Sequence, residues 1–155
     1  MQSRSRKRNV SEKSEPIVLT IRRAFPYSAE LVFDAWLDPE VAGRWLFATA
    51  TGEMKTVEIN PVVGGEFLIA EQRGDILAEH FGEYLEIERP RRLVFTFAAI
   101  RNVESTRVTV DIEPTDAGCE LTLVHEMDPK WIDYKERTES GWATLLANLA
   151  ATMVG

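Results

Sequence analysis

The sequence predicts an α+β domain in which a curved antiparallel sheet wraps around a long C-terminal helix and encloses an apolar interior. Two observations carry this prediction. Between residues 54 and 126, runs rich in β-branched and aromatic residues alternate with short turn segments, as they do in antiparallel hairpins. Between Pro129 and Met153, apolar residues recur instead at helical spacing. A sheet of many strands twists and the helix must bury its stripe, so we expect the sheet to curve around the helix.

The chain begins with one predicted strand and two short predicted helices. Residues Ile17–Ile21 alternate between apolar and more polar side chains, the period of a half-buried strand, and Pro26 ends the run. Ser28 is a suitable N-cap for a helix with one apolar face. Asp38-Pro39 combines a cap with proline at the first helical position, so we expect a second short helix from there to about Trp45.

Six further strands follow, separated by turns that contain glycine, proline, asparagine or aspartate. We expect them at Met54–Ile59, Glu66–Gln72, Leu77–Glu88, Leu93–Ala99, Glu104–Glu113 and Cys119–Glu126. Because the connections are short, successive strands should pair antiparallel. The expected order of elements is one strand, two helices, six strands and one helix.

The last predicted helix, Pro129–Met153, carries the clearest pattern in the sequence. Asp128-Pro129 again combines a cap with a first-turn proline. Its apolar stripe consists of Trp142, Leu145, Leu146, Leu149 and Met153. Gly141 interrupts this pattern at a cost of about 1 kcal/mol relative to alanine. Either the helix approaches the sheet closely at Gly141, or it breaks there into two helices.

Composition limits the environment and the partners. A single cysteine, Cys119, rules out an intramolecular disulfide and fits a reducing compartment. No apolar run is long enough to span a membrane, and no apolar stretch follows the basic N-terminus as in a secretory signal, so we expect a cytoplasmic protein. The net charge of −7 argues against nucleic-acid binding. We interpret residues 1–15 as a mobile basic leader and residues 16–155 as one domain.

No motif for catalysis or for a metal is present in the sequence. His125 and Glu126 do not begin a zinc-protease motif, because Pro129 stands where the second histidine belongs. His125 lies in phase with the leucines of its strand, so it is either a hydrogen-bonded core histidine or a group that orients a ligand or transfers a proton. His80 and Tyr84 share a phase and could form an acid–base pair or be structural. We therefore predict no catalytic residues, no metal and no cofactor.

Acidic residues on the predicted strands also allow two interpretations. Glu71, Glu79 and Glu83 could include a pair of catalytic carboxylates. We interpret them instead as solvated positions on the outward face of a half-exposed sheet.

Large aromatic residues are spread over the predicted helices and strands. They either fill the core or line a ligand cavity, for which volumes of roughly 300–1,000 Å³ are usual. The candidate ligand-binding residues are Trp36, Trp45, Phe47, Phe67, Phe81, Phe95, Phe97, His125, Trp142 and Leu146.

Several of these stretches together resemble a known family. The matching segments are Ile17–Phe25, Val32–Pro39, Trp45, Val63–Phe67, Gly82–Ile87, Pro90–Phe97, Gly118–Leu123 and Gly141-Trp142. In order and spacing they resemble the START and birch-pollen-allergen-like (SRPBCC) superfamily, in the branch named for the C-terminal domain of the activator of heat-shock-protein-90 ATPase. The resemblance covers about Pro16 to Val154. It implies a helix-grip fold with a cavity between the sheet and the last helix, and hydrophobic ligands in many relatives.

The resemblance does not imply one activity, because relatives include lipid carriers, hormone receptors, polyketide cyclases and a chaperone co-factor. We expect no ATPase activation, since those relatives carry an additional domain for which this chain is too short. Our first hypothesis is a binder of a small hydrophobic molecule. The alternatives are a cyclase or isomerase that uses His80, Tyr84 or His125, and a protein-interaction or stress-response/chaperone-associated module. For protein contacts, including a homodimer, the candidate residues are Trp131 and Tyr134. We expect neither nucleic-acid nor membrane partners.

Overall fold

The computed structural model describes residues 15–99 and 106–154. Its elements follow the predicted order. They are β1 (Ile17–Phe25), α2 (Ala29–Leu37), α3 (Pro39–Ala42), β2 (Glu53–Ile59), β3 (Glu66–Arg73), β4 (Ile76–Glu88), β5 (Arg92–Phe97), β6 (Thr106–Thr115), β7 (Gly118–Met127), the 3₁₀ helix η3 (Pro129–Tyr134) and α4 (Lys135–Val154). The predicted α+β class is confirmed.

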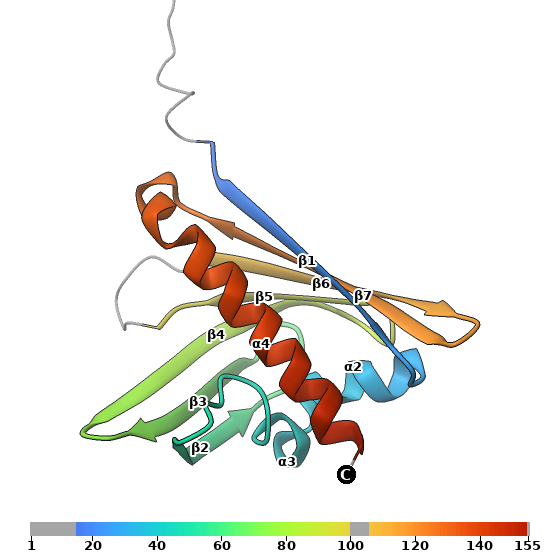
Figure 1. The fold of residues 1–155 in the computed structure, drawn as a ribbon, viewed down its shortest axis with the longest axis horizontal. Helices are drawn as coiled ribbons and strands as arrows, with labels where there is room; N and C mark the ends of the chain where they lie inside the picture. The colour runs from blue at the N-terminus through green and yellow to red at the C-terminus, as the bar shows by residue number, and fades with distance from the viewer. Residues whose placement is uncertain (1–14, 100–105, 155) are drawn as a thin grey trace, which may run out of the picture.

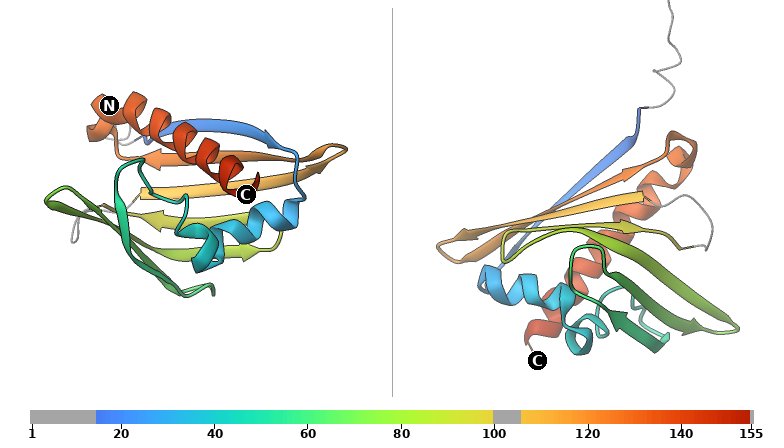
Figure 2. Two further views of the ribbon diagram at one scale, coloured as in Figure 1. Left: turned by 60° about the horizontal axis from the view of Figure 1, so that its bottom comes forward. Right: turned by 180° about the vertical axis from the view of Figure 1, so that it is seen from behind.

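The strands form one antiparallel sheet in the order β1-β7-β6-β5-β4-β3-β2. Strands β2 to β7 pair with their neighbours in sequence. Strand β1 instead pairs with β7, from Ile17 opposite Met127 to Phe25 opposite Cys119. The sheet curves, and α4 crosses its concave face (Figure 1). Helices α2 and α3 lie on that same side (Figure 2), so the sheet grips α4 as predicted.

Side-chain caps begin the helices where the sequence indicated. The Ser28 hydroxyl accepts a hydrogen bond from the Leu31 amide at 3.2 Å. The Asp38 carboxylate accepts one from the Glu40 amide at 3.0 Å. Helix α3, however, ends at Ala42 and not near Trp45, because Gly43 caps it and the chain continues in turns.

The predicted C-terminal helix is confirmed, but its first turns and its course at Gly141 differ from the expectation. The segment from Pro129 begins as η3, with Trp131 at φ −96° and ψ 19°, and the α-helix starts only at Lys135. Helix α4 then runs through Gly141 without a break. A Cβ atom added at Gly141 would meet nothing within 4 Å, so no close approach to the sheet explains the glycine either.

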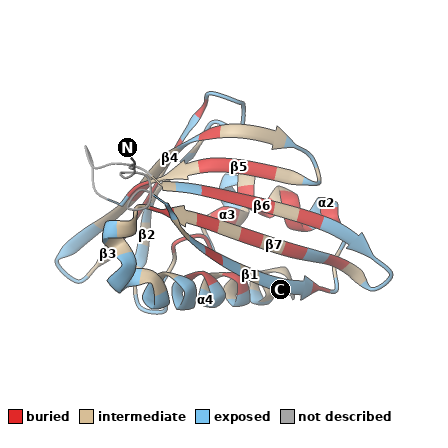
Figure 3. Cartoon of the chain, turned by 90° about the horizontal axis from the view of Figure 1, so that it is seen from above, coloured by how far each residue is buried: buried red, intermediate tan, exposed pale blue. Residues whose placement is uncertain are grey.

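The hydrophobic core lies between α4, α2 and the concave face of the sheet. Trp142, Leu146 and Leu149 of the predicted stripe are buried, while Leu145 and Met153 are half-buried at its margin. Buried positions alternate along β7, and buried residues run across β5, β6 and β7 (Figure 3). Each fully buried leucine or phenylalanine contributes about 1.5–3 kcal/mol. The side chains that α4 buries against the sheet therefore contribute to the stability of this fold.

Some predictions fall outside the described residues. Residues 1–14 lie outside the described part of the chain, so the division into a leader (1–15) and a domain (16–155) stays a prediction. The predicted strand from Glu104 is described only from Thr106, as β6. Within the described ranges, no helix combines the length and apolar character needed to cross a membrane.

Candidate functional site

A pocket opens between α4 and the part of the sheet formed by β3, β4 and β5. Its volume is about 250 Å³, and it is open to solvent. It is lined by Phe47, Arg73, His80, Phe97, Thr138, Gly141, Trp142 and Leu145. The four residues from α4 lie at spacings of three, one and three, and so form one face of the helix. The space beside the helix is thus an open pocket smaller than the internal cavity that we expected.

Three flat rings form the sheet side of this pocket. The ring of Phe47 stacks on that of His80 with centroids 4.4 Å apart and an interplanar angle of 2°. It also lies nearly parallel to Phe97, at 5.1 Å and 13°. Trp142 approaches Phe47 from the helix, with centroids 5.8 Å apart. Parallel rings at these distances stack on one another, so much of each ring face is covered by its neighbour.

His80 is a buried histidine with one ring nitrogen engaged. Its Nδ1 lies 3.2 Å from the Ile69 carbonyl oxygen. Since a carbonyl can only accept, Nδ1 carries the proton. Burial lowers the pKa of His80 to about 4, with a further contribution from the charge of Arg73, so the ring is neutral at pH 7. Its Nε2 is therefore an unprotonated acceptor.

Glu71 and Arg73 attach the loop that carries Phe47 to β3. The Glu71 carboxylate accepts hydrogen bonds from the Thr49 amide at 2.9 Å, the Thr49 hydroxyl at 3.0 Å and Arg73 Nε at 2.7 Å. Arg73 Nη2 donates to the Phe47 carbonyl at 3.0 Å. Burial alone would raise the pKa of Glu71. The hydrogen bonds lower it by more than burial raises it, so the pKa lies below its usual value. Glu71 is thus ionised and positions the loop.

Phe47 itself has a left-handed backbone, with φ 59°. For a residue other than glycine this conformation costs roughly 1–2 kcal/mol. The hydrogen bonds from Arg73 to the Phe47 carbonyl and from Thr49 to Glu71 offset that cost. They keep the Phe47 ring against His80, where it forms part of the wall.

His125 lies on β7 and is not among the residues that line the pocket. Both of its ring nitrogens make hydrogen bonds. Trp142 Nε1 donates to its Nδ1 at 3.0 Å. Since the indole can only donate, the proton of a neutral ring sits on Nε2, which lies 2.7 Å from the Thr106 hydroxyl. That hydroxyl donates in turn to the Phe97 carbonyl at 3.1 Å. Burial lowers the pKa of His125 to about 4. His125 is a satisfied core histidine that fastens α4 to the sheet.

The predicted ligand-binding residues fall into three groups. Phe47, Phe97 and Trp142 line the pocket. Those packed within the core are Trp36, Trp45, Phe67, Phe95, Leu146 and His125. Phe81 is half-buried and lies outside the core cluster, because successive side chains of a strand face opposite sides and its neighbour His80 faces inward.

The indoles of Trp36, on α2, and Trp45, after α3, pack together in the core. Their rings meet edge to face with centroids 4.7 Å apart. Trp45 Nε1 donates to the Ala35 carbonyl at 3.1 Å. Trp36 Nε1 is buried without a hydrogen-bond partner in the described part of the chain. Both indoles therefore belong to the buried core.

The suggested pairing of His80 with Tyr84 does not create a common site. Tyr84 packs on Phe67, with centroids 5.6 Å apart, and does not line the pocket. Burial raises the pKa of its hydroxyl above the ordinary value of 10. Of the three groups considered for acid–base chemistry, His80 alone lines the pocket.

The segment proposed for protein contacts is partly exposed. The rings of Trp131 and Tyr134 lie 5.6 Å apart. Trp131 is half-buried and Tyr134 is exposed, with the Arg137 guanidinium 5.1 Å from the tyrosine ring. A homodimer through this segment stays a prediction.

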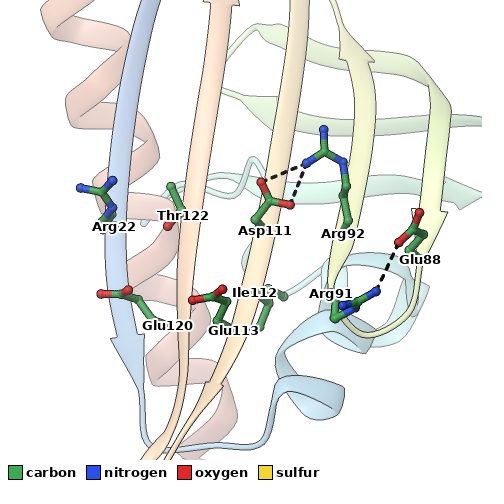
Figure 4. A pocket seen from close by; sticks show the side chains of 9 residues that line it. All are labelled: Arg22, Glu88, Arg91, Arg92, Asp111, Ile112, Glu113, Glu120 and Thr122. Atoms are coloured by element: carbon green, nitrogen blue, oxygen red, sulfur yellow. Dashed lines mark hydrogen bonds and ion pairs between the residues drawn. The ribbon is translucent and has the colours of Figure 1, made fainter.

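A second hollow, of about 590 Å³, lies on the face of the sheet turned away from α4 (Figure 4). A row of side chains crosses the strands there, with Arg22, Thr122, Asp111 and Arg92 in register. Arg92 binds Asp111 at 3.0 Å and Glu86 at 3.1 Å. The lining contains three arginines and four carboxylates, so this face carries charges of both signs with a small negative excess.

Sequence reasoning missed most of the polar and helical part of the pocket. Glu71 was interpreted as a solvated residue, but it is only 1% exposed, because the loop before β2 covers it. Arg73, Thr138 and Leu145 were not singled out as site residues. Gly141 was the available signal, since it interrupts an apolar stripe. In residues 15–99 and 106–154, no three His, Cys, Asp or Glu side chains gather as a metal site requires.

Comparisons with known proteins agree with this architecture. A protein of Chromobacterium violaceum superposes with a TM-score of 0.77 at 25% identity, over 86% of this chain and 94% of that one. A protein of unknown function from Staphylococcus aureus gives 0.81 at 16% identity, over 93% and 96%. The AHSA1-like protein from Aeromonas hydrophila gives 0.74 at 21% identity, over 88% and 91%. No curated protein sequence matches the chain.

The family model described as Activator of Hsp90 ATPase homolog 1-like protein matches residues 26–154. That match spans α2 to α4, including every pocket residue. The resemblance inferred from the sequence is confirmed, and the chain belongs to the Activator of Hsp90 ATPase homolog 1-like family.

Proposed function

We propose that this protein binds a small hydrophobic molecule in the pocket between α4 and strands β3–β5. The observation that carries the proposal is the open, mostly apolar pocket beside α4, whose apolar lining consists of Phe47, Phe97, Trp142 and Leu145. Apolar walls with few polar groups are typical of small-molecule sites. The fold supports the proposal, since it places one edge of the helix beside the sheet without closing the gap.

A catalytic role is less well supported. General acid–base chemistry needs a titratable group near the substrate and a partner that orients it. In the described part of the chain, His125 is occupied by Trp142 and Thr106, and Tyr84 packs in the core. His80 is left as the one acid–base candidate in the pocket, and it fits a role in orienting a bound molecule.

Thermal unfolding with a panel of lipids, sterols, flavonoids and polyketides tests the proposal. A ligand present at 100 times its Kd adds about 2.7 kcal/mol, which raises Tm by roughly 5–11 °C for a chain of this size. The control is Gly141→Leu, whose side chain would project into the pocket from a helix position that contacts nothing else. We expect at least one compound to raise the Tm of the wild type and not that of Gly141→Leu. A panel without any shift, or equal shifts in both proteins, contradicts the proposal.

A further inference from the structure

The face of the sheet turned away from α4 differs between its two halves. On the half formed by β5, β6 and β7, arginines pair with the carboxylates of neighbouring strands. Arg92 lies 3.0 Å from Asp111 and 3.1 Å from Glu86. Arg107 lies 3.9 Å from the same Glu86 carboxylate. Most of the charge on this half is therefore balanced within the sheet.

The other half, formed by β2, β3 and β4, carries acidic side chains without such partners. Glu66 on β3 and Glu83 on β4 stand directly opposite each other, and Glu58 on β2 lies on the same face. All three are exposed. In the described part of the chain, none of the three makes an ion pair. Like charges directly opposite each other destabilise a sheet, so these glutamates favour binding of a cationic group.

An apolar pair lies between these glutamates. Leu68 on β3 stands directly opposite Phe81 on β4, and Glu58 is the neighbour of Leu68 on β2. Leu68 and Phe81 are half-buried and lie outside the core cluster, because their side chains point away from α4. Leu77, four residues before Phe81 on the same face of β4, is 45% exposed. We call the surface of Glu58, Glu66, Glu83, Leu68 and Phe81 the acidic face.

The acidic face is accessible to a partner. Helices α2, α3 and α4 all lie on the opposite, concave side of the sheet (Figures 1 and 2). An open hollow of about 480 Å³ adjoins Glu58 and Glu66 at the turn between β2 and β3. Val62 and Val63, in the same turn, are 52% and 64% exposed. An extended or helical segment of another protein therefore has both space and apolar contacts at this edge.

The chemistry of the acidic face limits the class of partner. Nucleic acids and anionic membranes are repelled by three unpaired carboxylates. A polyamine or an inorganic cation neutralises the carboxylates but leaves Leu68 and Phe81 in contact with water. A basic protein segment that also carries apolar side chains satisfies both requirements.

We propose that the acidic face binds a basic, amphipathic segment of a partner protein. Lysine or arginine side chains of that segment pair with Glu58, Glu66 and Glu83. An apolar side chain between them packs on Leu68 and Phe81. This interaction surface is separate from the pocket beside α4 and does not depend on the proposed ligand.

The test uses three acetylated ten-residue peptides, which alternate lysine with valine, lysine with serine, and glutamate with valine. Fluorescence anisotropy at pH 7.5 and 0.15 M salt gives the affinities, and the amide resonances of Leu68 and Phe81 in NMR spectra report the place of binding. Burial of about 60 Å² of apolar surface corresponds to about ten-fold in affinity. We expect the lysine–valine peptide to bind about ten-fold tighter than the lysine–serine peptide, and the glutamate–valine peptide not to bind.

Two matched double variants locate the charge contribution. Glu66→Gln/Glu83→Gln neutralises the pair on the acidic face, and Glu113→Gln/Glu120→Gln neutralises a pair with the same geometry between β6 and β7. Both pairs are exposed and directly opposite across their strands, so the net charge changes equally and folding should persist. Two exposed ion pairs correspond to about five-fold in affinity. We expect that loss for the first variant and less than two-fold for the second.

The outcomes that overturn the proposal are distinct. Absence of binding by the lysine–valine peptide rejects the docking surface. Equal affinities of the lysine–valine and lysine–serine peptides mean that the glutamates attract counter-ions only. Equal weakening by the two double variants, or shifted resonances beside α4 and none at Leu68 and Phe81, places binding elsewhere. None of these results bears on the ligand pocket, which the compound panel tests separately.

Discussion

The two histidines of this protein occupy similar surroundings and differ in how completely they are bonded. His80 on β4 and His125 on β7 are both buried, and burial lowers the pKa of each to about 4. His125 has Trp142 on one nitrogen and Thr106 on the other. His80 has the Ile69 carbonyl on Nδ1, and its Nε2 is left as an acceptor at the pocket.

This difference shows that burial and a shifted pKa do not by themselves indicate function. His125 looked the more promising residue in the sequence, because it interrupts an apolar strand face. Its bonding is complete, so it has a structural role in joining α4 to the sheet. His80, which bonds through Nδ1, is the histidine that lines the pocket.

The largest expected effect is on the free energy of unfolding, and it concerns the contact between Trp142 and His125. Trp142→Ala removes a buried indole and leaves His125 Nδ1 without its donor, so we expect a loss of about 3–5 kcal/mol in the free energy of unfolding. Chemical denaturation measures this. As a control, Trp142→Phe keeps a ring and loses only the hydrogen bond, for which about 1–3 kcal/mol is expected. A loss below 1 kcal/mol for Trp142→Ala would contradict the structural role.

The second effect is the dependence of stability on pH. Both folded-state pKa values lie near 4, below the unfolded value of 6.5. Above pH 6.5 both histidines are neutral in either state, and stability is complete. As the pH falls from 6.5 to 4, the unfolded chain takes up protons that the folded chain does not. Each histidine should then lower stability by about 1.4 kcal/mol per pH unit.

His80→Phe separates the two contributions. With one titrating ring left, the slope of unfolding free energy against pH between 6 and 4.5 should fall to about half. NMR should also show opposite neutral tautomers, with the proton on Nδ1 of His80 and on Nε2 of His125. Identical tautomers would refute the distinction between the two rings.

A smaller effect is expected at the loop that forms the pocket wall. Glu71→Gln weakens the contacts with Arg73 and Thr49 that hold Phe47 in place, so we expect a loss of about 1–3 kcal/mol. Glu83→Gln, at an exposed position on β4, is the control and should change stability by less than about 0.5 kcal/mol. Equal effects of both substitutions would mean that Glu71 is solvated, as the sequence had suggested.

Local patterns predicted most of this fold and little of the pocket. Caps at Ser28 and Asp38 and the stripe from Trp142 to Leu149 act within one element, so their periodicity and spacing are visible in the sequence. The start of η3 was missed because a 3₁₀ turn and an α-helix share the same cap-and-proline signal.

The pocket depends on contacts between distant segments. Glu71 is buried because a loop 22 residues earlier in the chain folds over it. Arg73 is positioned by that same carboxylate and by the Phe47 carbonyl. Neither relationship leaves a periodic trace, so sequence alone could not distinguish Glu71 from the exposed Glu83.

The smallest expected effect concerns Gly141, which has no packing role that would explain it. A Cβ atom at this position would meet nothing within 4 Å, and the helix continues on both sides. Gly141→Ala should therefore stabilise the protein by about 0.5–1 kcal/mol through helix propensity, as measured by chemical denaturation. Gly43→Ala is the contrasting variant, because its Cβ would lie 3.0 Å from a Val57 methyl carbon and should bring no such gain. If Gly141→Ala destabilises the protein, α4 packs more tightly at this point than the structure shows, and the glycine serves the fold instead of the pocket.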